Sequence, residues 1–295
     1  YLMYCAMASL AVSSALWMTA TSANPIAIQV VKDFGLDINF GKWLLTASVP
    51  ALAAIALLPL VVERLFPPGV GETPEAPRAA RKALAEIGPL SRNEWITAVV
   101  FVVMVAGWVL ADALKLNVTS IAFAGFGLLL LANVLTVDDI ANQGETLATF
   151  LWLAVLFAMS GQLNELGFMG YAGQRPAAHI GGLSWPVTYV LLVVLYVAIH
   201  YMFVSQSSQV LALLGVFLDV GVRAGVPAPL MAYALMFASS YFSVITPQGG
   251  SQNVIFVGSA YLKQGELYRL GLLVTLFFLL IFLGLGTGWI LLVAR

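Results

Sequence analysis

Charged residues are scarce in this chain, and their scarcity decides its class. Only 9% of the 295 residues are lysine, arginine, aspartate or glutamate, whereas 61% are hydrophobic. An ordinary soluble domain carries about 25% charged residues. We therefore expect an all-α polytopic membrane protein surrounded by the lipid bilayer. The net charge is −1, and no basic cluster gives a reason to expect nucleic acid as a partner.

Cysteine and histidine are almost absent. The one cysteine, Cys5, excludes a disulfide within the chain and a multi-cysteine metal site. With two histidines, His179 and His200, a zinc centre is not expected. No paired carboxylates, Ser-His-Asp order or metal-spaced histidines occur in or beside an apolar run, so neither an enzyme nor an organic cofactor is expected.

Long apolar runs predict the membrane spans. Clean runs of sufficient length occupy 43–62, 95–111, 118–137, 146–164 and 270–293. Residues 63–94 contain five basic residues, five acidic residues and five prolines. They are predicted to form a cytoplasmic linker with an amphipathic helix near Arg78 to Ile87. Counting spans from this linker places the carboxyl end outside.

Three uncharged stretches are interrupted by polar and helix-breaking residues. Residues 180–218 carry SQSSQ at 205–209, which predicts a re-entrant hairpin over about 184–222 with its tip there. Residues 229–262 are broken at TPQGGSQN, and residues 1–31 at TATSANP, so each is predicted to form two half-helices. Close packing of small residues is the other explanation, but it does not require such long polar runs.

The two breaks follow a common pattern. From Ser13 and from Ser239 the chain runs Ser-Ser, an apolar piece, a polar break, a second apolar piece, a turn and a span. This alignment pairs Ser13 with Ser239 and Leu36 with Leu262. An odd number of crossings lies between the copies, so the repeats would be inverted, a pattern typical of secondary transporters.

The repeat also defines the domains. Residues 1–62 would end a first repeat, 63–94 would be the linker, and 95–295 would form the second repeat. The chain begins inside an apolar run, so we expect the first repeat to be truncated. At each break a half-helix N-terminus would face an anion, and unwound carbonyls would hold a cation. A channel and a membrane-embedded acyl or lipid-group transferase are the alternatives.

Four segments resemble the divalent anion:sodium symporter family, and within it the branch of 2-oxoglutarate/malate translocators and bacterial citrate, succinate and tartrate carriers. They are SSALWMTATSANPIA, FPPGVGETPEAPRAARKALAEIGPLSRNEWI, HYMFVSQSSQVLALLGVFL and SVITPQGGSQNVIFVGSAYLKQGELYRLG. The resemblance implies a homodimeric carrier of succinate, malate, 2-oxoglutarate, tartrate or citrate in a bacterial inner membrane. It further implies inverted repeats and an elevator-like motion.

The resemblance also implies a set of site residues. The hairpin tip would contribute Ser205, Gln206 and Ser207, the second break Thr246, Pro247 and Gly249, and the first break Thr21, Asn24 and Pro25. A coupling cation, Na⁺ or H⁺, would lie at Gln206, Thr246, Thr19 and Ala20. Gln206 stands where many sodium-coupled members have asparagine, which favours exchange.

A few isolated residues allow a further interpretation. His200 either donates to a carboxylate or senses pH, or it is a packing residue bonded to backbone. Asp219 and Arg223, four residues apart, are predicted to pair on a helix. Four aromatic residues near span ends are predicted to be interfacial anchors, namely Trp43, Trp95, Trp185 and Tyr268.

Overall fold

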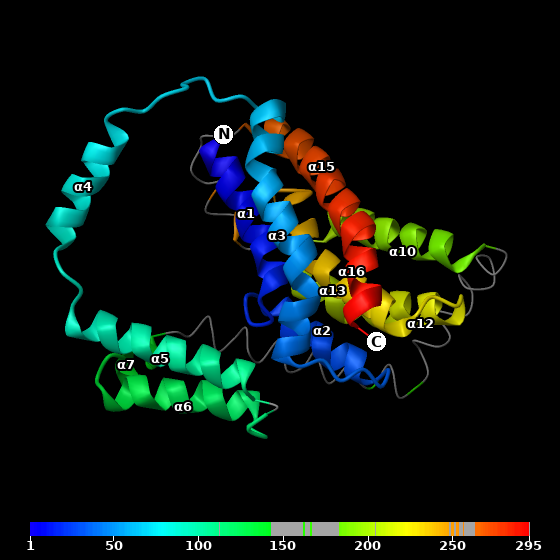
Figure 1. The fold of residues 1–295 in the computed structure, drawn as a ribbon, viewed down its shortest axis with the longest axis horizontal. Coiled ribbons are helices and arrows are strands. Elements are labelled where there is room, and N and C mark those ends of the chain that lie inside the picture. Colours follow the sequence, from blue (N-terminus) through cyan, green and yellow to red (C-terminus); the bar gives the residue numbers. More distant parts are fainter. Residues whose placement is uncertain are drawn as a thin grey trace. The chain divides into compact units, whose positions relative to one another are not determined.

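The structure is a computed structural model that describes residues 1–111, 113–142, 162, 166, 183–203, 205–247, 249–250, 252–253, 256 and 263–294. Every regular element in these ranges is a helix, which confirms the all-α class (Figure 1). Within them, four helical segments are long and apolar enough to cross a bilayer: Phe40–Leu65, Arg92–Val109, Trp185–Met202 and Gly265–Val293. The chain forms two compact units, residues 1–67 with 154–295, and residues 68–153.

The core of the first unit is built on α13 (Ala228–Tyr241). Every residue from Leu230 to Tyr241 is buried, as expected of a helix that is apolar on all sides. Helix α1 (Leu2–Leu16) packs against both α13 and α3 (Phe40–Leu65). The buried face of α1 includes Ala8, Ala11 and Ala15, whose small side chains allow close approach of neighbouring helices.

Which residues of helix α3 are buried depends on the helix face they lie on rather than on how close they are to the end of the span. Its inward residues Trp43, Ala47, Ala51 and Leu58 are spaced at helical intervals. Trp43 is fully buried, and its indole N–H donates to the Ala15 carbonyl at 3.0 Å. The prediction that Trp43 is an interfacial anchor is therefore wrong.

The predicted hairpin has two arms that lie side by side (Figure 1). The first arm is α10 (Trp185–Ile199), extended by a 3₁₀ turn, η1 (His200–Met202). The second is a continuous helix made of α11 (Gln206–Gln209), the π-helical turn η2 (Val210–Leu214) and α12 (Gly215–Arg223). Asp219 accepts from Arg223 Nε at 2.7 Å, which confirms that predicted pair.

The remaining helices of this unit lie beside the two breaks. Helix α2 (Ala23–Lys32) follows α1 after the unwound residues 17–22, and the 3₁₀ turn η3 (Phe242–Val244) ends α13. The last predicted span is a continuous helix of α15 (Gln264–Ile281), η4 (Phe282–Gly286) and α16 (Thr287–Val293). It begins six residues earlier than predicted because Glu266 accepts from the Lys263 N–H at 3.0 Å and caps it.

The second unit contains the predicted linker helix and two apolar helices. Helix α4 (Ala76–Ile87) confirms the amphipathic helix predicted near Arg78 to Ile87. None of its residues is buried. Helix α5 (Arg92–Val109) begins with a Ser91–Glu94 capping box and packs on α6 (Val118–Leu131). Helix α6 ends at Leu131, before the predicted end at residue 137, because Asn133 adopts a positive φ that a helix does not allow. Thr136 then caps the short helix α7 (Val137–Ala141). Apart from Gln162, the predicted span 146–164 lies outside the described residues, and the assignment of repeats stays a prediction.

The exposed linker allows a test of topology. In a Cys5→Ser background, a cysteine placed at Glu75 should react with a membrane-impermeant maleimide only after permeabilisation, because five basic residues favour the cytoplasmic side. A cysteine at Ala294 is the matched control and should react in intact cells. The reverse pattern would overturn the predicted orientation.

Candidate functional site

The first helix break is held by a single asparagine. The chain leaves α1 at Trp17, whose backbone is extended, and resumes as α2 at Ala23. The last carbonyls of a helix lack intrahelical donors. Asn24 is fully buried, and its Nδ2 donates to the carbonyls of Ser14 at 2.9 Å and Trp17 at 3.0 Å. The amide thus replaces N–H groups that a continuous helix would have supplied.

The second break uses the same device. Asn253 is also fully buried, and its Nδ2 donates to the carbonyls of Ser243 at 2.7 Å and Thr246 at 3.2 Å. In both breaks the amide reaches back ten and seven residues. The two breaks are therefore structurally equivalent, with Asn24 corresponding to Asn253.

This equivalence corrects the alignment of the repeats. It pairs Ser14 with Ser243, an offset of 229, whereas pairing Ser13 with Ser239 gives 226. Three residues are nearly one helical turn, so either offset keeps the same helix faces aligned. The paired serines before each break are therefore too weak a marker of register.

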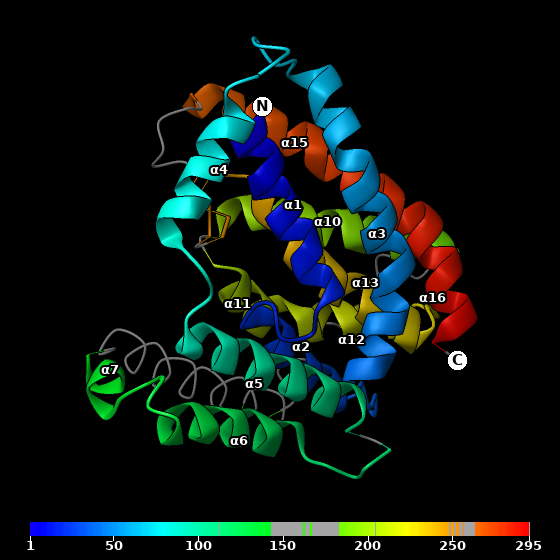
Figure 2. The ribbon, with the colours of Figure 1, turned by 60° about the vertical axis from the view of Figure 1, so that its left-hand side comes forward.

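The hairpin tip connects the first break to the end of α13. Ser207 Oγ lies 3.0 Å from Ser22 Oγ, and α11 contacts α2 (Figure 2). Gln206 Nε2 donates to the carbonyls of Ser239 at 2.9 Å and Ser240 at 3.2 Å. The tip thus joins segments that are far apart in the sequence.

A cavity of about 370 Å³ opens between these elements. All of the described residues that line it are uncharged: Leu10, Ser13, Ser14, Trp17, Ala20, Thr21, Ser22, Gln206 and Gln252. The Thr21 hydroxyl is buried without a hydrogen-bond partner among the described residues. Such an arrangement of neutral donors suits a small polar ligand.

The predicted site residues fall into three groups. Ala20, Thr21 and Gln206 line the cavity. Asn24, Ser205 and Ser207 support it, Ser205 as the N-cap of α11 with its Oγ accepting from Ser208 N at 3.4 Å. The other predicted residues do not line it: Thr19 and Pro25 are exposed, Pro247 is half-buried, and Thr246 and Gly249 are buried in the second break.

Several residues that line the cavity were not predicted from the sequence. Ser22 lies in the predicted first break, and Gln252 in the polar run after Thr246, yet neither was singled out. Ser13 and Ser14 appeared only as a marker of the repeat. Their common signal is a hydroxyl or amide within a few residues of a break, which identifies the region but not which side chains face inward.

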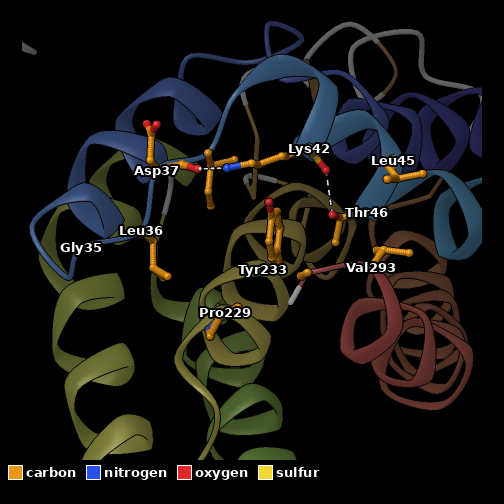
Figure 3. Close-up of a pocket in the computed structure, with 11 residues that line it drawn as sticks. Gly35, Leu36, Asp37, Lys42, Leu45, Thr46, Pro229, Tyr233 and Val293 are labelled. Carbon is orange, nitrogen blue, oxygen red and sulfur yellow. Dashed lines mark hydrogen bonds between the residues drawn. The ribbon is translucent and has the colours of Figure 1, made fainter. Parts of the chain in front are cut away.

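A second cavity of about 360 Å³ lies elsewhere in the same unit (Figure 3). It is lined by the turn between α2 and α3 and by parts of α3, α13 and α16. In it, Lys42 Nζ donates to the Asp37 carbonyl at 3.1 Å, and Thr46 Oγ1 donates to the Lys42 carbonyl at 2.7 Å. None of the predicted site residues lines it, so we do not assign it as the site.

Comparison with known families decides the class of protein. The model of the sodium:sulfate symporter transmembrane region matches residues 1–294. The chain belongs to this symporter family. The predicted resemblance to divalent anion:sodium symporters is thereby confirmed, as is the multi-pass membrane location.

Relatives within the symporter family carry transporter names. The putative malate transporter YflS of Bacillus subtilis (strain 168) is 32% identical over 279 residues, which are 94% of this chain and 58% of that protein. The chloroplastic dicarboxylate transporter 2.1 of Arabidopsis thaliana is 32% identical over 281 residues, 94% of this chain and 50% of that protein. The chain spans about half the length of the curated relatives it matches. The symporter family and these names support the transporter class that was predicted, rather than an enzyme.

The two asparagines should be essential for stability. Asn24→Ala or Asn253→Ala removes a buried amide donor shared by two carbonyls at the helix end, so each should lower the free energy of unfolding by about 2–4 kcal/mol. Thermal unfolding of the purified protein in detergent measures the change. The exposed Asn93→Ala is the control and should change stability by less than about 0.5 kcal/mol. Unchanged stability of both buried variants would contradict the role assigned to the amides.

Proposed function

We propose that this chain is part of a secondary transporter of di- and tricarboxylates, with the cavity at the first break and hairpin tip as its anion site. Support for the substrate class comes from the relatives named as malate and dicarboxylate transporters. Inverted repeats, a homodimer and elevator-type alternating access, which the family resemblance implies, are part of this proposal.

The observation that carries the proposal is the meeting of two helix N-termini beside the cavity. Helix α2 begins after Ser22, and the continuous helix 206–223 begins after Ser205. Their first turns approach within 3.0 Å at the Ser22 and Ser207 hydroxyls. A helix N-terminus carries about half a positive charge and attracts anions. Two of them attract a dianion without burying a charged side chain, which would cost several kcal/mol.

The tip residue Gln206 supports exchange as the mode of transport. Its amide nitrogen already donates to the Ser239 and Ser240 carbonyls at the end of α13. These oxygens are therefore partly used, and are less free to coordinate a sodium ion at that place. We accordingly propose that one carboxylate is exchanged for another.

Counterflow in proteoliposomes containing the full-length protein tests this function. Liposomes loaded with unlabelled malate should accumulate labelled malate above equilibrium, because only a carrier couples the two fluxes through one site. A panel of unlabelled mono-, di- and tricarboxylates then ranks the substrates by competition. Uptake that is unaffected by internal malate would exclude exchange.

The unpaired Thr21 hydroxyl allows a sharp test of the site. Thr21→Val keeps the side-chain shape and removes only the hydroxyl, so a lost hydrogen bond to a carboxylate should raise the apparent malate constant about 10- to 100-fold. Thr275→Val is the matched control, because Thr275 is also buried without a hydroxyl partner among the described residues but does not line the cavity. Equal affinities of the two variants would place the anion elsewhere.

A further inference from the structure

His200 joins the hairpin to the second break. It ends α10, and none of its surface is exposed. Its Nδ1 lies 2.7 Å from Gln209 Oε1 on the hairpin, and its Nε2 lies 2.6 Å from the Gly249 carbonyl oxygen. Gly249 permits this approach, since a Cβ there would lie 3.1 Å from His200 Nε2 and 2.5 Å from the Ser243 carbonyl oxygen. The ring therefore bonds to both segments at once.

The hydrogen-bond network around this ring favours its protonated form. Gln209 Nε2 lies 2.7 Å from the Tyr196 carbonyl, which can only accept. The amide nitrogen must therefore face Tyr196, and the amide oxygen faces His200. Both ring nitrogens of His200 then face acceptors. A neutral imidazole has one N–H and satisfies one of them, whereas the imidazolium satisfies both.

Three features reduce the cost of burying this charge, which is several kcal/mol for an unpaired ion. Both hydrogen bonds are charge-assisted in the imidazolium form. The ring lies at the C-terminal end of α10, where the helix dipole favours a cation. It also stacks on Phe242 with centroids 3.7 Å apart and planes at 18°, within reach of a cation–π attraction.

The titratable groups around this ring leave its charge uncompensated. The sequence has no aspartate, glutamate, lysine or arginine at 183–218 or at 224–262. Between these ranges, Asp219 and Arg223 on α12 pair with each other. The turn η1 and the helices that contact η1 and η3 also carry titratable residues, but none of them is a described contact of the ring: Tyr189, Tyr196, Tyr201, Tyr233, Tyr241, Tyr4 and Cys5 on α1, and Glu266, Tyr268 and Arg269 on α15. The described contacts of His200 therefore include no carboxylate that would neutralise it.

We propose that His200 is a protonation site, and that the proton bound there strengthens the binding of the carboxylate in the cavity. The imidazole takes one proton from water and becomes imidazolium, which ties Gln209 to Gly249. Two residues that line the cavity are close to these contacts in the sequence: Gln206 lies three residues before Gln209, and Gln252 lies three residues after Gly249. The proton therefore positions two cavity residues and adds positive charge near the anion. Because linkage is reciprocal, anion and proton each strengthen the binding of the other.

The first experiment does not require transport. Thermal unfolding of the substrate-free, full-length protein in detergent is followed from about pH 6 to about pH 9, which brackets ordinary histidine titration. The wild-type Tm should fall as pH rises, because the protonated ring bonds two acceptors and the neutral ring only one. His200→Gln should lose this part of the pH dependence, and His179→Gln should retain it. Gln209→Leu should also lose it although the histidine remains, because a neutral ring then satisfies the one remaining acceptor.

The second experiment rests on the proposed function and measures coupling. The apparent malate constant in counterflow should rise about tenfold from about pH 6.5 to about pH 9 in the wild type and stay constant in His200→Gln. Malate itself stays doubly ionised over this range, because ordinary carboxyl pKa values are about 4. A wild-type Tm without a contribution from His200 overturns the protonation site. A pH-dependent Tm with a pH-independent malate constant overturns the coupling. Absence of any counterflow overturns the proposed function and leaves the first experiment valid.

Discussion

A helix that stops inside an apolar core leaves carbonyl oxygens without donors, and this constraint organises the first unit. The chain meets it twice, with a buried asparagine that reaches back over the break. Asn24 extends the network further, because its Oδ1 accepts from Ser240 on α13 at 3.3 Å. The hairpin tip then bonds to the same end of α13 through Gln206. The polar groups around the cavity therefore depend on one another for their partners.

The two breaks use the same asparagine contact, but their buried polar atoms are not equally supplied with hydrogen-bond partners. With an offset of 229, Ser240 corresponds to Ala11, which has no hydroxyl. Asn253 Oδ1 consequently lacks a partner among the described residues, and so does Thr246 Oγ1. Each unsatisfied buried atom costs about 1–3 kcal/mol, so the second break is less stabilised by its own hydrogen bonds. The contact of His200 with Gly249 supplies a bond to this break that its own residues do not provide.

Composition and polar interruptions were sufficient to predict the described helices at 43–62, 95–109, 118–131 and 270–293, the two arms around the tip and the helix end at each break, because such features depend on solvation over many residues. The Asp219–Arg223 pair also followed from local spacing. Side-chain direction did not follow, since it depends on tertiary packing. Trp43 lies inward because α3 presents that face to α13, and Ser22 rather than Pro25 faces the cavity because of where α2 begins. The register of the repeats depended on Asn24 and Asn253, whose long-range role no local pattern reveals.

The described residues that line the cavity carry no fixed charge, and this has a consequence for transport. A carrier must bind its substrate strongly enough to select it and weakly enough to release it. A buried arginine would hold a dianion tightly and would remain an uncompensated charge after release, at a cost of several kcal/mol. Helix dipoles and neutral hydroxyls give weaker attraction and leave no net charge behind. An ionisable ring next to such a site adds attraction that appears with a proton and disappears when the proton leaves, so binding strength can change without a large rearrangement of the fold.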